Sequence, residues 1–157
     1  MNITLISVGG LKEDYLERAM AEYTKRIGAY ARWDEVHIKE EKLTDESPAA
    51  VRAALAAEGQ RIAAALPRDA FCIALCVEGK MLSSEAFAQV LGKARDEGGK
   101  VCFVIGSSWG LDARVKEACD LRLSFSPMTF PHTLMRVILA EGVYRALTIL
   151  AGKRYHK

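Results

Sequence analysis

Val101-Cys-Phe-Val-Ile-Gly-Ser-Ser-Trp-Gly-Leu111 (VCFVIGSSWGL) is the stretch of sequence that decides the fold of this chain. Its first half is an unbroken apolar run, which is typical of a strand covered on both faces of a sheet. Two glycines follow that run, and a helical pattern begins at Asp112. The stretch therefore predicts a strand, a tight turn at its carboxyl end and a helix, which is the repeating unit of a parallel α/β sheet.

Strand and helix patterns alternate on both sides of this stretch. Strand patterns cover residues 3–9, 34–40, 70–79, 101–106 and 121–126. Helical patterns cover residues 13–30, 49–66, 83–97 and 112–118, and a last helix opens at Pro131 or His132 and runs to Leu150. Such alternation with short connections predicts an α/β fold: a mostly parallel sheet with helices on both faces. The length of 157 residues predicts a single domain over residues 1–157.

The composition is that of an ordinary globular protein, with 50% hydrophobic and 27% charged residues. No apolar run approaches the roughly 20 residues that cross a bilayer, so no membrane segment is expected. The first residues read as a strand and not as a signal peptide, which predicts a cytoplasmic location. Four cysteines without a C-x-x-C pair and only three histidines predict reduced thiols and no metal site.

The turn at Gly106–Gly110 matches G-x-S-x-G, the pattern around a hydrolase nucleophile. Ser108 would be that nucleophile, and Asp112 or Asp120 followed by His132 would give the hydrolase chain order. However, Asp112 is only one helical turn beyond Ser108, and the chain lacks an H-G-G-G segment for a second oxyanion donor. These departures disfavour a serine hydrolase.

The same turn also fits a binding loop. Gly106 and Gly110 lack a Cβ atom, so the backbone can turn sharply there and approach a ligand closely. The small Ser107 and Ser108 can bond that ligand or cap the next helix. The turn lacks G-x-G-x-x-G, so it is not the dinucleotide fingerprint. A tight turn that binds nothing remains the alternative.

Two more loops follow strand patterns and share this position, at residues 75–80 and 124–132. In open α/β sheets, ligands bind beyond the carboxyl ends of the strands. The second of these loops, SFSPMTFPH, is bracketed by Pro127 and Pro131, which fix its backbone groups in one arrangement. Such groups can read the edge of an adenine, and Phe130 or Met128 can cover its face. The three loops therefore predict one ligand site.

The last helix is apolar on almost every side and needs cover from more than one direction. A second copy of the chain in a two-fold homodimer would supply that cover, and burial within one chain is the alternative. Arg136, Glu141 and Arg145 then lie on or near a buried surface, where charges need partners or a role. The basic tail contains Tyr155 and His156 and is either a frayed terminus or a finger for phosphates and bases.

Several motifs resemble those of the ribosomal large-subunit methyltransferase H family. They are ISVGG at residues 6–10, L..EGK at 75–80, FVIG...GL at 103–111, LSFS.MTFPH..MRV.L.E..YRA at 123–146 and the ending YHK. The resemblance covers essentially the whole chain, and its C-terminal block is far longer than the G-x-S-x-G match. It implies that GSSWG is a cofactor loop and that Ser108 is not a nucleophile.

The resemblance implies an enzyme of the SPOUT class, whose α/β domain contains a C-terminal trefoil knot. Such enzymes use S-adenosylmethionine to methylate N3 of a pseudouridine in large-subunit (23S) ribosomal RNA; they act as homodimers, on assembled ribosomes. The cofactor residues carried over are Leu75, Gly106, Phe125, Ser126, Pro127, Met128, Thr129, Phe130 and Pro131. Many relatives have a second glycine where this chain has Ser107, and an acidic residue or Asn where it has Trp109. These departures concern the shape of the site and not its location.

Methylation of a ring nitrogen needs a base or a cation near the reacting group. The candidates are His132, Arg136, Arg145, Tyr155 and His156. We expect the tail of one subunit to reach the cofactor pocket of the other, because a basic aromatic tip must meet RNA where the methyl group is. A capping role for His132 is the plain alternative. A ribosome-binding protein without enzyme activity is a third class of function, beside the methyltransferase and the hydrolase.

Overall fold

A computed structural model gives the structure of this chain and describes residues 1–155. Its sheet has five strands in the order β2-β1-β4-β3-β5, and every neighbouring pair is parallel. The strands are β1 (Asn2–Val8), β2 (Arg32–Ile38), β3 (Phe71–Met81), β4 (Lys100–Ile105) and β5 (Leu121–Ser124). The predicted α/β class and parallel sheet are confirmed.

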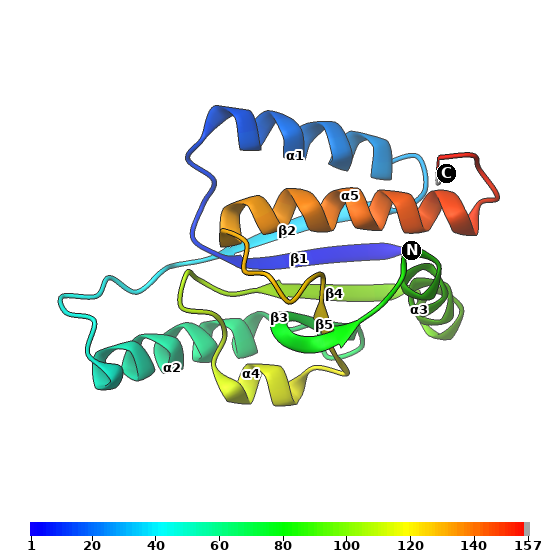
Figure 1. Ribbon diagram of the computed structural model, residues 1–157. Coiled ribbons are helices and arrows are strands. Elements are labelled where there is room, and N and C mark those ends of the chain that lie inside the picture. Colours follow the sequence, from blue (N-terminus) through cyan, green and yellow to red (C-terminus); the bar gives the residue numbers. More distant parts are fainter. Residues whose placement is uncertain (156–157) are drawn as a thin grey trace.

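Helices cover both faces of this sheet, as predicted (Figure 1). They are α1 (Asp14–Ile27), α2 (Pro48–Ala65), α3 (Ser84–Glu97), α4 (Ala113–Ala118) and α5 (His132–Leu150). Residues of α1, α3 and α5 share one hydrophobic cluster with the sheet, and residues of α2 and α4 share the other. None of the helices within residues 1–155 is long and apolar enough to cross a membrane.

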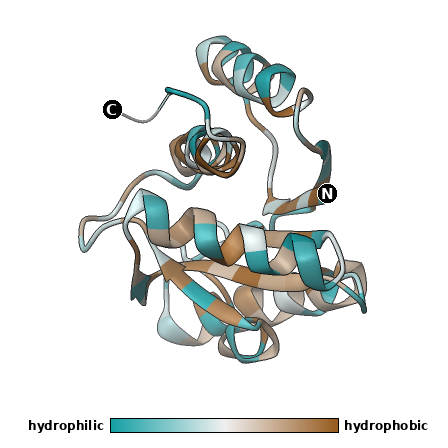
Figure 2. Ribbon diagram, turned by 90° about the vertical axis from the view of Figure 1, so that its right-hand side faces the viewer, coloured by the Kyte–Doolittle hydropathy of each residue, from teal (hydrophilic) through white to brown (hydrophobic). Residues whose placement is uncertain are grey.

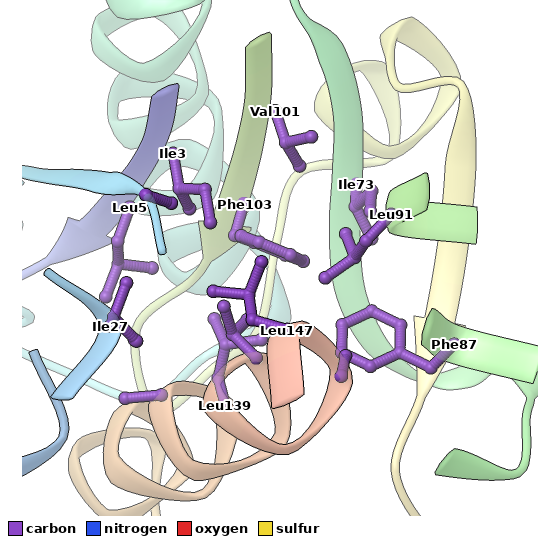
Figure 3. Packing of buried hydrophobic residues seen from close by; sticks show 14 of the residues in the cluster. Ile3, Leu5, Ile27, Ile73, Phe87, Leu91, Val101, Phe103, Leu139 and Leu147 are labelled. Carbon is purple, nitrogen blue, oxygen red and sulfur yellow. The ribbon is translucent and has the colours of Figure 1, made fainter. Parts of the chain in front are cut away.

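Alternation along the strands divides the core into these two clusters. In β4, Val101 and Phe103 face α3 and α5, whereas Cys102 and Val104 face the α2 side. Figure 3 shows Phe103 between strand residues and the helix residues Leu147, Leu91 and Phe87. In Figure 2 brown, apolar colouring covers much of the strands and of α5, where teal and pale residues interrupt it. The decisive apolar run is therefore the centre of the molecule.

Local signals fix the helix starts. The Ser47 hydroxyl accepts a hydrogen bond from the Ala50 N–H at 3.2 Å, and Pro48 occupies the first helical position of α2. The Ser83 hydroxyl caps α3 in the same way, through the Ala86 N–H at 3.1 Å. Such caps satisfy N–H groups that have no partner inside the helix.

Helix α5 obtains most of its apolar cover within one chain. It lies against α1 and α3 over one face of the sheet (Figure 1), and Leu139, Val143 and Leu147 are buried. Leu134 nevertheless keeps 37% of its surface exposed. Internal packing thus accounts for most of the apolar girth that the sequence shows.

Strand β3 is irregular near its carboxyl end. Its pairing with β5 shifts register between Leu75 and Lys80. In this interval Gly79 lies directly against the backbone of β5, where an added Cβ atom would be 2.6 Å from the Leu123 carbonyl carbon. Only glycine allows two backbones to approach this closely. The irregular residues, 76–79, bend over the edge of the sheet.

Candidate functional site

A cavity of about 620 Å³ opens at the carboxyl edge of β3, β4 and β5. The irregular end of β3 (residues 75–78) forms its first wall, and the loops after β4 and β5 form the second and third walls. This is the edge at which the sequence predicts a ligand site in an open α/β sheet. Its lining includes the predicted residues Leu75, Gly106, Phe125, Ser126, Met128, Thr129, Phe130, Pro131 and His132. Pro127 is exposed and is not part of the lining. The structure therefore brings eight of the nine residues carried over by resemblance to one cavity.

The glycine turn forms the second wall. The Gly110 N–H donates to the Ser107 carbonyl at 2.9 Å, and Gly110 has a φ of 91°. At Gly106 an added Cβ atom would lie 1.9 Å from the Gly110 carbonyl oxygen. Neither position tolerates a side chain without movement of the backbone. The predicted tight turn is confirmed, and both of its glycines line the cavity.

Ser107 supplies a buried polar atom to this wall. Its side chain is 5% exposed, and its Oγ atom has no hydrogen-bond partner among the described residues. A buried hydroxyl without a partner costs roughly 1–3 kcal/mol, so such groups are normally satisfied by a ligand or water. The residues of the cavity thus fit a ligand with polar edges. The second glycine expected from the resemblance would have no such hydroxyl.

The third wall is a loop that is fixed by its own hydrogen bonds. The Ser124 hydroxyl bonds to the Ser126 carbonyl at 3.0 Å, and the Met128 N–H donates to the Ser126 hydroxyl at 3.0 Å. Phe125 anchors the loop, because its ring packs edge-on against Phe87 with 6.1 Å between the centroids. Met128 stays 71% exposed at the rim. The loop therefore presents an ordered backbone to the cavity.

The side chains of a serine hydrolase do not come together. Ser108 is exposed, and the Asp112 carboxylate caps α4 and pairs with Arg114. The Asp120 carboxylate accepts a hydrogen bond from the Cys72 N–H at 2.7 Å, near the amino end of β3 and far from the turn. Neither acid is placed to orient His132. The geometry gives Ser108 no catalytic triad.

His132 is the titratable candidate that lines the cavity. It opens α5 and is half-buried, and its pKa is lowered by burial and by the positive charge of Arg136. The carboxylates of Glu40 and Glu13 oppose this shift without reversing it. At neutral pH the imidazole is therefore uncharged and can accept a proton.

Arg136 lies one helical turn beyond His132 and is fully buried. Its Nη2 atom donates to the Val8 carbonyl at 2.5 Å, while its Nε and Nη1 atoms find no partner among residues 1–155. Burial lowers the pKa of the guanidinium. Arg136 is not a lining residue of the cavity. Its charge affects the site by lowering the pKa of His132.

Arg145 lies in the C-terminal half of α5, and Tyr155 follows this helix in the same chain. The Tyr155 hydroxyl donates to Glu141 at 3.1 Å, and the Arg145 guanidinium lies 5.0 Å from the centre of the Tyr155 ring. Thirteen residues of helix separate His132 from Arg145, which is about 20 Å along the axis. The catalytic candidates thus form two separate groups within one chain. His156 lies outside the described residues.

Sequence reasoning missed several cavity residues. Cys76, Glu78 and Lys116 line the cavity, beside the apolar Met135. Glu78 belongs to the EGK motif, which was a usable signal, but nothing in the helical pattern around Lys116 connects it to a strand end. The four cysteines are free thiols, and two of them, Cys76 and Cys119, are only half-buried. No group of three metal-ligating side chains occurs in the described part of the chain.

Comparison with known proteins agrees with this geometry. The sequence model of a family described as "Predicted SPOUT methyltransferase" matches residues 1–156. A "Probable Methyltransferase from Bordetella pertussis Tohama I" has a similar fold, with a TM-score of 0.58 at 17% identity over 92% of this chain and 95% of that one. A probable methylase family protein from Haemophilus influenzae gives a TM-score of 0.53 at 12% identity, covering 99% of this chain and 70% of that chain. The parallel α/β fold and its three-loop cavity therefore define a methyltransferase of the SPOUT class.

Comparison with the sequences of curated proteins identifies the family within this class. The chain is 48% identical over 159 residues to the ribosomal RNA large subunit methyltransferase H of Bacillus pumilus, with all of both chains covered. It is 48% identical over 162 residues to the protein of that name from Bifidobacterium adolescentis, again over both full lengths. The chain belongs to the ribosomal RNA large subunit methyltransferase H family.

Proposed function

We propose that this chain methylates N3 of a pseudouridine in large-subunit ribosomal RNA, with S-adenosylmethionine as the methyl donor. The observation that carries the proposal is the cavity: its three walls contain Leu75, Gly106 and the loop from Phe125 to Pro131. Family membership supports the RNA substrate, because the relatives are named as ribosomal RNA methyltransferases. The trefoil knot belongs to this proposal, and the close approach of Gly79 to Leu123 is compatible with it.

The cavity residues fit an adenosyl cofactor. Ordered backbone groups of the third loop can bind the adenine edge, and the unpartnered Ser107 hydroxyl can bond a polar group of the cofactor. When bound, S-adenosylmethionine supplies a methyl group on a positively charged sulfur. The protein's task is to hold the target nitrogen in line with that carbon, and positioning of this kind lowers barriers by several kcal/mol.

His132 is the residue proposed to accept the proton of the target nitrogen. A ring imide nitrogen is a weak nucleophile until it loses its proton, and general bases of this kind contribute roughly 10²–10⁴-fold. Burial and Arg136 keep His132 unprotonated at neutral pH. Arg136 is a positioning residue in this scheme, because its charge acts on the His132 imidazole while its own side chain does not line the cavity.

The tail is proposed to act across a homodimer. Within one chain Tyr155 docks against Glu141 and Tyr144, neither of which lines the cavity. Two copies paired with their α5 helices antiparallel would bring the tail of each beside the cavity of the other. The partly exposed Leu134 near the start of α5 fits such a contact. Tyr155 and Arg145 would then meet RNA beside the partner's His132.

Assembled ribosomes in the cytoplasm are the proposed substrate. The net charge of the chain is only +2, and phosphate contacts dominate the affinity of proteins for free nucleic acid. A preformed ribosomal surface would supply contacts that a small, nearly neutral protein lacks.

The test is transfer of labelled methyl groups from S-adenosylmethionine to ribosomes from a strain that lacks this gene. Label in one large-subunit nucleotide, mapped to N3 of a pseudouridine, is the expected result. Stripped ribosomal RNA in parallel reports whether assembly is needed. Absence of label in both samples, together with absence of cofactor binding, would contradict the proposal.

A further inference from the structure

We infer that the ion pair between Glu78 and Lys116 is a positioning element of the cofactor site. The pair holds the first wall of the cavity, at the end of β3, against α4, the helix that follows the glycine turn. The inference rests on the proposed function, because it assigns the cavity to an adenosyl cofactor. The Lys116 Nζ atom lies 2.5 Å from the Glu78 Oε1 atom. Both residues line the cavity, so the pair closes one side of it.

The pair links the end of β3 to α4, in addition to the apolar packing that these two elements share. Glu78 belongs to the irregular end of β3, where pairing with β5 is interrupted between Leu75 and Lys80. Lys116 belongs to α4, a helix of six residues that directly follows the glycine turn. A ladder of backbone hydrogen bonds would fix the first wall, but the register shift removes that ladder for residues 76–79. A side-chain link from Glu78 to α4 takes its place.

A second contact holds the same wall from the other side. Gly79 packs against the backbone of Arg122 and Leu123, with no room for a Cβ atom. The wall is thus fixed at Gly79 by close packing and at Glu78 by charge. Leu75, the first wall's predicted cofactor residue, lies immediately before this doubly held segment.

The electrostatics support a permanent link. The hydrogen bond from Lys116 lowers the pKa of the Glu78 carboxyl, and the charge of Arg122 acts in the same direction. The Glu78 carboxyl is therefore ionised at neutral pH. The Glu78 side chain is 54% exposed and that of Lys116 is 23% exposed, so salt weakens the pair. Its contribution to global stability is small, and its effect is local: it sets the position of the wall.

The experiment is a double-mutant cycle on cofactor affinity, with E78Q, K116M and the double variant E78Q/K116M in the full chain. Binding of S-adenosylhomocysteine is measured by calorimetry, and methyl transfer to ribosomes gives kcat and the KM for S-adenosylmethionine. We expect each single variant to bind about two- to fivefold more weakly, which is the scale of one exposed ion pair. The double variant should be no weaker than either single one, because all three lack the same link. kcat at saturating cofactor should stay unchanged.

The matched control is K100M, which breaks the exposed ion pair of Lys100 with Asp69. This pair lies at the amino ends of β3 and β4, away from the cavity. This variant should bind the cofactor analogue as the wild type does. At about 1 M KCl, where the Debye length is about 3 Å, the wild type should approach the affinity of K116M.

Three outcomes overturn the inference. Wild-type affinity in both single variants would mean that the link does not position the wall. Additive losses in the double variant would mean that each side chain acts on the cofactor separately. A fall in kcat with unchanged affinity would place the pair elsewhere in the reaction. If the wild-type protein itself binds no analogue, the proposed function fails, and this failure is distinct from the other three.

Discussion

His132 and Arg136 lie one turn apart on α5, and burial together with the positive charge of Arg136 lowers the pKa of the histidine that lines the cavity. Only the histidine borders the ligand space, and only the arginine is fully buried. The two side chains therefore have different roles. His132 can exchange a proton with a substrate, and the charge of Arg136 favours the neutral form of His132.

The pH dependence of methyl transfer follows from this relationship. Because the folded pKa of His132 is below its ordinary value of 6.5, the neutral base is fully present above pH 6.5 and is lost as the pH falls through the folded pKa. The lowered pKa also affects the free energy of unfolding. The contribution of His132 is fully present above pH 6.5 and is lost as the pH falls through the folded pKa. We expect kcat to fall on the acid side with a midpoint below 6.5. In H132Q this limb should disappear and activity should drop roughly 10²-fold or more; an unchanged acid limb in H132Q would contradict the assignment.

Replacement of Arg136 should separate stability from activity. Two of its donor nitrogens are buried without a partner among residues 1–155, and a buried charge that is not fully compensated carries a desolvation penalty of several kcal/mol, which methionine removes. We expect R136M to keep or raise the melting temperature while methyl transfer falls at least tenfold. Thermal denaturation and methyl-transfer assays on one preparation check both parts. A destabilisation beyond about 3 kcal/mol would show instead that the bond to the Val8 carbonyl holds the fold.

The turn at Gly106 should not tolerate a side chain. A Cβ atom there would overlap the Gly110 carbonyl oxygen, so G106A must displace the second wall. We expect binding of S-adenosylhomocysteine to fall at least tenfold in calorimetry, with little change in far-ultraviolet circular dichroism. G98A is the matched control, because a Cβ at Gly98 meets no atom within 4 Å. Equal affinities of G106A and the wild type would remove the turn from the site.

Removal of Tyr155 to Lys157 should abolish methyl transfer and leave cofactor binding intact. Tyr155 contacts Glu141, Tyr144 and Arg145 of its own chain, none of which lines the cavity, so we expect its loss to leave that cavity intact. Light scattering should report an unchanged oligomer. Heterodimers of one full-length and one truncated chain should keep about half of the activity, because one of the two cavities still receives a tail. Full activity of the truncated homodimer would refute the role of the tail.

Much of the fold could be predicted because its central strands carry an unambiguous pattern. The run from Val101 to Ile105 is apolar at every position, and it forms the buried strand that it predicts. β2 was harder, because it is an edge strand with polar residues on its exposed side: the pattern indicates residues 34–40, whereas the strand is Arg32–Ile38. Its start is set by pairing of Arg32 with Asn2, which is a long-range contact that no local pattern contains.

The site was predictable where it consists of strand ends and turn residues. Gly106 and the loop from Phe125 are consecutive in sequence with the strands that place them. Lys116 was not predictable, because its position depends on how α4 packs against the bent end of β3. Arg136 was recognised as a charge on an apolar helix, but its place behind the cavity depends on the approach of α5 to the end of β1.

The walls of the cavity include the backbone of the glycine turn and of the loop ordered around Ser126, and this feature bears on resistance to inhibitors. A competitive compound that bonds to the main-chain groups of these walls would meet atoms that no side-chain substitution removes. A change at Gly106 or Gly79 would close or displace a wall, because neither position has room for a Cβ atom. Such a change would exclude the cofactor together with the drug. Few single substitutions in these walls would therefore exclude such a compound and still leave the cavity open.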